Sequence, residues 1–229
     1  MNAPMKTQFP VLLFDFEGTL VDFQWKLKDA ARDIKNELRL LGFEPSHWEN
    51  NYATLRNNAA QLALQTGLDK RVTMDRLDPI YDRYDQDAAS RWSVFPGVKT
   101  VLARLKSERQ IQLGLVSNVG RRALDEVLPR LGLAGLFDVI ITRNDVEMLK
   151  PSGEGIRIAL GKLGAANSDV LFIGDSVTDV LGAKDAGVNM AIIQGGESAP
   201  TSLVAAAPSY LWNAIEEIET LYNGGEQIE

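Results

Sequence analysis

The chain has 229 residues, of which 45% are hydrophobic and 24% charged, proportions typical of a globular protein. It contains no cysteine and one histidine, His47, which excludes disulfides, thiol nucleophiles, cysteine-containing zinc sites and paired-histidine zinc motifs. The formal net charge is −7 and no run is rich in Lys and Arg, which argues against nucleic-acid binding. Any enzymatic chemistry would therefore use carboxylates, hydroxyls, lysine or a hard metal ion.

The sequence shows neither a membrane-spanning run nor a signal peptide, and both absences bear on where the protein is expected to act. No apolar run approaches the ~18 residues that span a membrane, and the first eight residues lack the apolar core of a signal peptide. We therefore expect a cytoplasmic protein that binds neither membrane nor nucleic acid and is a monomer or a homodimer. His47 is expected to lie at the start of a helix and to have no catalytic role.

Short apolar runs rich in β-forming residues recur along the chain and predict buried strands. These runs are residues 10–14, 111–116, 139–142, 170–173 and 188–194. Stretches with helical spacing, such as 124–131 and 156–163, separate the later runs. Apolar strands that alternate with helices predict an α/β fold whose parallel sheet is covered on both faces.

Residues 22–92 break this alternation. They contain no strand-like run but show helical periodicity, for example in Leu27, Ala30, Ile34 and Leu38. We therefore expect an all-helical insertion after the first strand. Residues 210–212 are expected to form a last edge strand, followed by a helix that continues through residue 221.

Four groups of polar residues follow strand-like runs, where open α/β sheets bind their ligands. In chain order they are Asp15-Phe16-Glu17-Gly18-Thr19, Ser117-Asn118, Lys150-Pro151 and Gly174-Asp175-Ser176-Val177-Thr178-Asp179. A carboxylate can attack phosphorus, Mg²⁺ prefers oxygen ligands, and a lysine together with a metal ion can screen a phosphate from nearby acids. Each group alone is common in turns and helix caps, but the four together predict phosphoryl transfer.

Through these motifs the sequence resembles the haloacid dehalogenase-like (HAD) superfamily of hydrolases. It is most similar to the phosphoglycolate phosphatase-like branch, which carries a helical cap after the first motif. The resemblance runs from Asp15 through residues 95–98 to residues 183–187. It implies a Rossmann-like catalytic core made of residues 1–21 and 93–229, a helical cap made of residues 22–92, and Mg²⁺-dependent hydrolysis of a small phosphorylated substrate.

The resemblance also implies roles by motif position. Asp15 would be the nucleophile, and it would bind Mg²⁺ together with the main-chain carbonyl of Glu17 and the side chain of Asp175. Asp179 would be a supporting acid. The residues expected to hold the phosphoryl group are Ser117, Asn118 and Lys150.

Glu17 departs from the family pattern, because the phosphatases of this superfamily carry Asp-x-Asp at the first motif. In the family, this second acid protonates the leaving group and then activates water. Glutamate keeps the carboxylate but adds a methylene group, which displaces the acid unless the backbone adjusts. The expected protein is therefore a phosphatase that works with a displaced acid, a slowed phosphatase, or one that binds phosphate without turnover. Replacing Glu17 with Asp is expected to give at least wild-type activity.

Two further functions remain open. One is metal-independent carbon–halogen hydrolysis, which the paired acids Asp175 and Asp179 disfavour because they would repel a haloacid anion. The other is an impaired phosphate-binding or interaction protein on the same fold, supported by Glu17. Five cap residues are candidates for substrate contact, although any one of them is more simply explained by packing or by a solvated surface: Trp25, Lys26, Lys28, Arg56 and Asn57.

Overall fold

The computed structural model describes residues 8–45, 48, 51–67 and 69–222. Its centre is a parallel sheet with the order β3-β2-β1-β4-β5-β6. The strands are β1 (Val11–Phe14), β2 (Gln112–Val116), β3 (Val139–Ile141), β4 (Val170–Gly174), β5 (Asn189–Ile193) and β6 (Tyr210–Trp212). The α/β fold with a parallel sheet is thereby confirmed, including the edge strand at residues 210–212.

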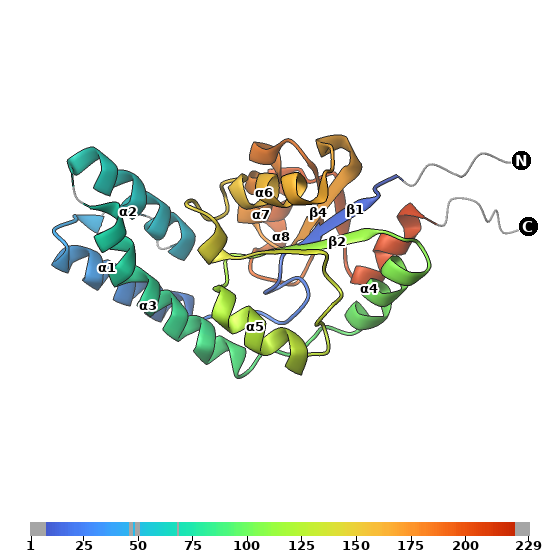
Figure 1. Ribbon diagram of the computed structural model, residues 1–229, viewed down its shortest axis with the longest axis horizontal. Helices are drawn as coiled ribbons and strands as arrows, with labels where there is room; N and C mark the ends of the chain where they lie inside the picture. Colours follow the sequence, from blue (N-terminus) through green and yellow to red (C-terminus); the bar gives the residue numbers. More distant parts are fainter. Residues whose placement is uncertain (1–7, 46–47, 49–50, 68, 223–229) are drawn as a thin grey trace, which may run out of the picture.

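Both faces of the sheet are buried over most of their area, which explains why its strands are mostly apolar. Leu12 and Phe14 of β1 pack on one face, and Val11 and Leu13 pack on the other. The first face is covered by α4 (Val98–Ser107), α5 (Arg121–Arg130) and the 3₁₀ helix η4 (Ile215–Leu221). The second is covered by α6 (Glu154–Leu163), α7 (Val177–Ala186) and α8 (Pro200–Ala206), and Figure 1 shows these two helical layers.

The last described element is a 3₁₀ helix, where the sequence predicted a helix of unspecified type. Ile215 and Ile218, three residues apart in η4, are both buried against the first face of the sheet. A 3₁₀ helix has three residues per turn, so this spacing places both side chains on one side. Two shorter 3₁₀ turns, η2 (Arg143–Asp145) and η3 (Asn167–Asp169), precede α6 and β4.

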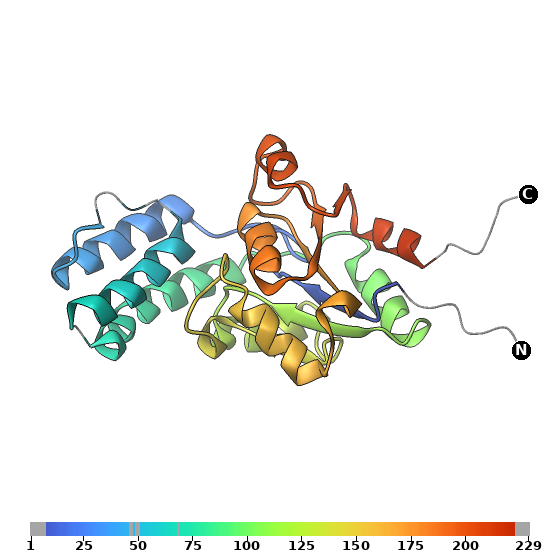
Figure 2. The ribbon, with the colours of Figure 1, turned by 90° about the horizontal axis from the view of Figure 1, so that it is seen from above.

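Within the described residues, the insertion between β1 and α4 contains the helices α1 (Leu27–Leu40), α2 (Tyr52–Thr66) and α3 (Lys70–Ala89). They pack on one another and project from one side of the α/β core, as Figures 1 and 2 show. Ala30, Ile34 and Leu38 form the buried stripe of α1, as their spacing predicted. Residues 46 and 47 lie outside the described residues, so the expectation that His47 starts a helix stays a prediction.

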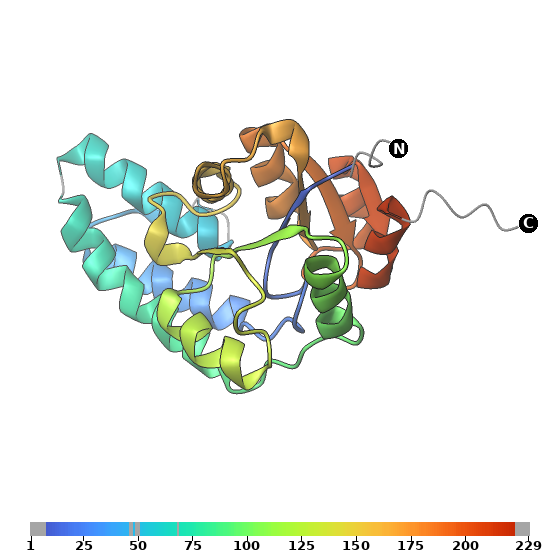
Figure 3. The same cartoon turned by 45° about the vertical axis from the view of Figure 1, so that its right-hand side comes forward.

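Two linkers join this helical cap to the core and run beside each other. Val21 forms an antiparallel bridge with Val94, and the main-chain N–H of Asp22 donates to the carbonyl of Ser93 at 3.0 Å. Figure 3 shows the cap beside the core with α5 below it.

No helix within the described ranges has both the length and the apolar character needed to cross a membrane.

Candidate active site

The polar motifs meet at the carboxyl edge of the sheet because the strands that precede them are parallel neighbours. Asp15 follows β1, and Asp175 follows β4, the strand paired with β1. The chain passes to β2 on one side of β1 and later to β4 on the other. A ligand-binding crevice forms where the strand order reverses in this way. Ser117, after β2, completes the edge.

Three carboxylates gather in this crevice. One oxygen each of Asp15, Asp175 and Asp179 lies within 4.8 Å of the others. Nζ of Lys150 lies 2.6 Å from Oδ1 of Asp15 and 2.7 Å from Oδ1 of Asp179. The ammonium group also lies 5.3 Å from the centre of the Phe172 ring. The buried lysine therefore neutralises part of a strongly negative cluster.

The pKa values reflect this crowding. Burial raises the pKa of Asp15 to about 6 although Lys150 opposes the shift, and burial followed by the charges of Asp179 and Asp15 raises the pKa of Asp175 well above its usual value. Burial alone would lower the pKa of Lys150, but Asp15 and Asp179 outweigh it and raise that pKa. A divalent cation would relieve the remaining repulsion, and an all-oxygen donor set suits Mg²⁺. Asp15 and Asp175 therefore fit the predicted metal site, and the structure adds Asp179 to their cluster.

Asp179 is held in place by the start of α7. Its Oδ2 accepts from the main-chain N–H of Ser176 at 3.0 Å and from the Ser176 hydroxyl at 2.6 Å, while the Ser176 hydroxyl accepts from the Asp179 N–H. This reciprocal capping box explains why an acid lies three residues after Ser176 at the helix start. Asp179 thus caps α7 and pairs with Lys150 at the same time.

Asp175 is fixed by residues to which the sequence assigned no role. The Thr19 hydroxyl donates to its Oδ1 at 2.9 Å, and the main-chain N–H of Glu197 donates to its Oδ2 at 2.6 Å. Gly18, at φ +84°, and Gly196 both lie so close to this carboxylate that a Cβ would collide with it. The only sequence signals were the position of Thr19 in the first motif and a glycine pair before Glu197.

Asn118 positions Lys150 through the main chain. Its Oδ1 accepts from the N–H of Lys150 at 3.0 Å, and its Nδ2 donates to the Lys150 carbonyl at 3.3 Å. Ser117 is buried beside it, and its Oγ accepts from the N–H of Val119 at 3.2 Å. The Ser117 hydroxyl keeps its proton for another acceptor, such as a phosphoryl oxygen.

Glu17 lies at the base of the cap. Its Oε1 accepts from the main-chain N–H groups of Gln24 at 2.6 Å and Trp25 at 2.8 Å, and from Nε1 of Trp92 at 2.8 Å. Burial raises the pKa of Glu17 to about 7, and the Trp92 hydrogen bond opposes the rise. The predicted roles of Glu17 in proton transfer and, through its carbonyl, in metal binding stay predictions.

The cap contacts the core beside these residues. On α2, the amide of Asn57 pairs with the main chain of Leu149, and the guanidinium of Arg56 donates to the carbonyl of Glu147 at 3.3 Å. Burial first, and then the charges of Glu197, Asp15 and Glu17, raise the pKa of Tyr52 well above its usual value. Asn57 and Arg56 therefore hold the cap on the core.

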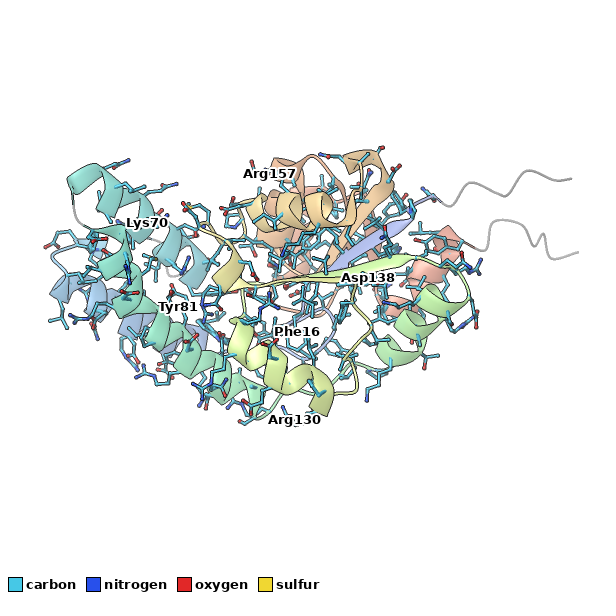
Figure 4. The ribbon with its side chains drawn as sticks, in the orientation of Figure 1. Phe16, Lys70, Tyr81, Arg130, Asp138 and Arg157 are labelled. Atoms are coloured by element: carbon cyan, nitrogen blue, oxygen red, sulfur yellow. The ribbon has the colours of Figure 1, made fainter. Side chains whose placement is uncertain are left out.

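The other cap candidates differ in their surroundings. The Trp25 ring packs on Tyr52 with 4.5 Å between the ring centres, whereas Lys26 forms an exposed ion pair with Asp87. Lys28 is exposed on α1. Tyr52 was not singled out in the sequence, because an aromatic residue at a helix start looks like ordinary core. Figure 4 shows where these parts lie: Tyr81 is on α3 in the cap, and Phe16 is in the α/β core.

Comparison with known proteins agrees with this geometry. Residues 12–193 match the profile of the haloacid dehalogenase-like hydrolase family. The chain belongs to this family. The match runs from β1 through β5 and so includes the cap and all four motifs.

Individual relatives span most of the chain. It is 32% identical over 181 residues to a phosphoglycolate phosphatase of Yersinia pseudotuberculosis, which covers 76% of each chain. It is 28% identical over 211 residues to pyrophosphatase PpaX of Oceanobacillus iheyensis, covering 92% of this chain and 95% of that one. The structure of a haloacid dehalogenase-like family hydrolase from Streptococcus pneumoniae superposes with a TM-score of 0.63 at 20% identity, over 95% of this chain and 100% of the other. This last similarity shows the shared fold.

Proposed function

We propose that this protein is a Mg²⁺-dependent phosphatase that hydrolyses a small phosphorylated metabolite through an aspartyl-phosphate on Asp15. The observation that carries the proposal is the ammonium group of Lys150 held between Asp15 and Asp179, at 2.6 and 2.7 Å, next to Asp175. A buried carboxylate beside a fixed cation is suited to attack an anionic phosphoryl group that would otherwise be repelled. Relatives named as phosphatases support the same reaction class.

In the proposed reaction, a carboxylate oxygen of Asp15 forms a bond to phosphorus while the bond from phosphorus to the ester oxygen breaks. The leaving oxygen takes a proton and departs as an alcohol. Water then attacks the phosphorus, the Asp15–phosphorus bond breaks, and inorganic phosphate and free Asp15 are formed. Lys150 and the hydroxyl of Ser117 hold the phosphoryl oxygens in both steps.

The residues that would hold Mg²⁺ are Asp15 and Asp175, with the carbonyl of Glu17 as the third protein ligand predicted from the family. When bound, the metal would supply positive charge against the phosphoryl oxygens. Asp179 would keep Lys150 directed at Asp15, and Thr19 would keep Asp175 in place. Because Mg²⁺ and Lys150 are both needed to balance the acids, activity should require both.

In this mechanism the second acid of the first motif, Glu17, would transfer the proton. Oε1 of Glu17 accepts three hydrogen bonds from the cap linkers, so in this arrangement that oxygen is directed at the linkers. This supports a phosphatase slowed at the proton-transfer step. It also favours, as a second candidate, a protein that binds phosphate compounds without turning them over.

The decisive experiment measures Mg²⁺-dependent release of phosphate from p-nitrophenyl phosphate, 2-phosphoglycolate and pyrophosphate. Wild type, Asp15→Asn and Glu17→Asp are compared, and the peptide that contains Asp15 is examined for phosphorylation by mass spectrometry. Hydrolysis by wild type that is lost in Asp15→Asn and on chelation supports the phosphatase. If wild type and Glu17→Asp are both inert yet bind a phosphate analogue, the phosphatase proposal fails and the protein is one that binds phosphate compounds without turnover. Halide release that resists a chelator would point instead to dehalogenation.

A further inference from the structure

The carboxylate of Glu17 joins three segments that are far apart in the sequence. Gln24 and Trp25 lie in the linker that leaves the core for the cap, and Trp92 lies at the start of the linker that returns. Glu17 itself is in the loop that follows β1, two residues after Asp15. A single oxygen therefore connects the loop of the nucleophile to both linkers of the cap.

The surroundings show that this connection is a built feature. Glu17, Trp25 and Trp92 are all buried, so the N–H groups that face Glu17 have little access to water. The Phe16 ring meets the Trp92 ring edge to face, with 5.1 Å between the centres. Buried donors are rarely left without an acceptor, and Glu17 supplies it here.

The two linkers are also joined to each other. Oδ1 of Asp22 accepts from the N–H of Ser93 at 2.6 Å, and the guanidinium of Arg91 donates to the carbonyl of Gln24 at 2.9 Å. The linkers thus form a paired unit, which the side chain of Glu17 attaches to the catalytic loop beside the main-chain hydrogen bond from the Gly18 N–H to the Val21 carbonyl at 2.7 Å. A change in the attachment would move the cap relative to Asp15.

The length of the side chain decides which role position 17 can fill. An aspartate carboxylate would lie about 1.5 Å closer to the main chain, one carbon–carbon bond, and could not reach all three donors without a backbone shift. We propose that Glu17 is a positioning residue that ties both cap linkers to the catalytic loop, and that the extra methylene serves this tie in place of proton transfer. The inference rests on the proposed function only for its effect on kinetics.

Hydrogen–deuterium exchange of the two linkers tests the tie without any need for turnover. The variants are Glu17→Gln, whose amide oxygen can still accept three hydrogen bonds, Glu17→Ala and Glu17→Asp, with Glu126→Gln on the exposed face of α5 as the matched control. We expect exchange at Gln24 and Trp25 to be about tenfold faster in Glu17→Ala and Glu17→Asp, and unchanged in Glu17→Gln and the control. Exchange in Glu17→Ala equal to that of wild type overturns the tie.

Trp92→Phe separates the two linkers, because it removes the indole N–H and keeps a ring against Phe16. The main-chain amides of the return linker should then exchange faster, while the amides of Gln24 and Trp25 stay protected. Trp92→Phe also tests the tie if Glu17→Ala fails to fold. Equal exchange in both linkers of Trp92→Phe and wild type would contradict the proposal.

Steady-state kinetics distinguish a positioning residue from a proton donor. Glu17→Gln should keep kcat within about fivefold of wild type, whereas loss of a general acid would cost about a hundredfold or more. Glu17→Asp should raise KM without lowering kcat, since the cap is loosened and a carboxylate remains. A hundredfold loss of kcat in Glu17→Gln with protected linkers would make Glu17 the proton donor. If wild type hydrolyses no phosphate ester, the proposed function fails, and the exchange measurements still decide the tie.

Discussion

The carboxamide of Asn57 and the main chain of Leu149 form a reciprocal pair, in which Nδ2 donates to the carbonyl at 2.8 Å and Oδ1 accepts from the N–H at 2.8 Å. Asn57 lies on α2 of the cap, and Leu149 directly precedes the lysine that contacts Asp15. The position of the cap is therefore coupled to the position of Lys150. Since both partners are buried, the pair cannot be replaced easily by water.

Asn57→Ala should weaken this docking. Unpairing two buried main-chain groups costs about 1–3 kcal/mol each when water cannot reach them, and opening of the cap would recover part of that loss. We expect a KM about tenfold higher with a smaller change in kcat, measured by steady-state hydrolysis. Asn36→Ala, on an exposed part of α1, is the control. An unchanged KM would show that Asn57 has no part in substrate capture.

A second cap–core contact surrounds Arg143, whose side chain is 1% exposed. Its guanidinium lies 2.6 Å from Oδ2 of Asp85, which also accepts from the Gly120 N–H at 2.9 Å, while Oδ1 accepts from the indole of Trp25 at 2.9 Å. Asp85→Ala would leave a buried guanidinium without its main anionic partner. Breaking a buried ion pair in this way typically costs about 3–5 kcal/mol.

Urea denaturation measures this cost as a fall in the free energy of unfolding of Asp85→Ala. The control is Asp82→Asn, because the Asp82 carboxylate also pairs with Arg143 but is 46% exposed. An exposed partner contributes about 1 kcal/mol or less, so this variant should be much closer to wild type. Equal losses in the two variants would contradict the dominant role of Asp85.

The sequence predicted the strands and most of the candidate-site residues at the carboxyl edge of the sheet, because both depend on local patterns. A buried parallel strand is apolar throughout, and Asp15, Ser117 and Asp175 each directly follow such a run. Parallel neighbours bring their carboxyl ends together, so placing the residues on strands was enough to predict that they meet.

The contacts that the sequence did not reveal join residues far apart in the chain. Glu17 and Trp92 are 75 positions apart, and Asp85 and Arg143 are 58 apart. An arginine after a strand has the same local pattern whether it is solvated or buried against a carboxylate. Only the packing of the cap on the core decides which of the two occurs, and no local periodicity encodes it.

Mg²⁺ should stabilise the folded protein through the carboxylate cluster. Binding only to the folded state adds about 2.7 kcal/mol at a metal concentration one hundred times the Kd, which for a chain of this length raises Tm by about 5–10 °C. Asp175→Asn should remove most of this shift, whereas Asp125→Asn on the exposed side of α5 should keep it. Thermal unfolding with Mg²⁺ and with a chelator measures the difference. The same Mg²⁺ shift in Asp175→Asn as in wild type would place the metal elsewhere.

Stability should depend on pH through Glu17. Its pKa is raised by burial from 4.5 to about 7 in the folded protein, against the opposing Trp92 hydrogen bond. Between these two values the folded state binds more protons than the unfolded state, so the free energy of unfolding falls as the pH rises. The full effect is on the order of 3 kcal/mol, complete above about pH 7.

Comparison with Glu17→Gln isolates this contribution, because the amide does not titrate while its oxygen can still accept from Gln24, Trp25 and Trp92. Urea unfolding of both proteins in a chelator, from pH 5 to pH 8, should give similar stabilities at pH 5. Wild type should then become progressively less stable than the variant up to about pH 7, with a constant difference above it. Parallel curves over this range would mean that the Glu17 carboxyl has its ordinary pKa in the folded protein and that burial does not disfavour its charge.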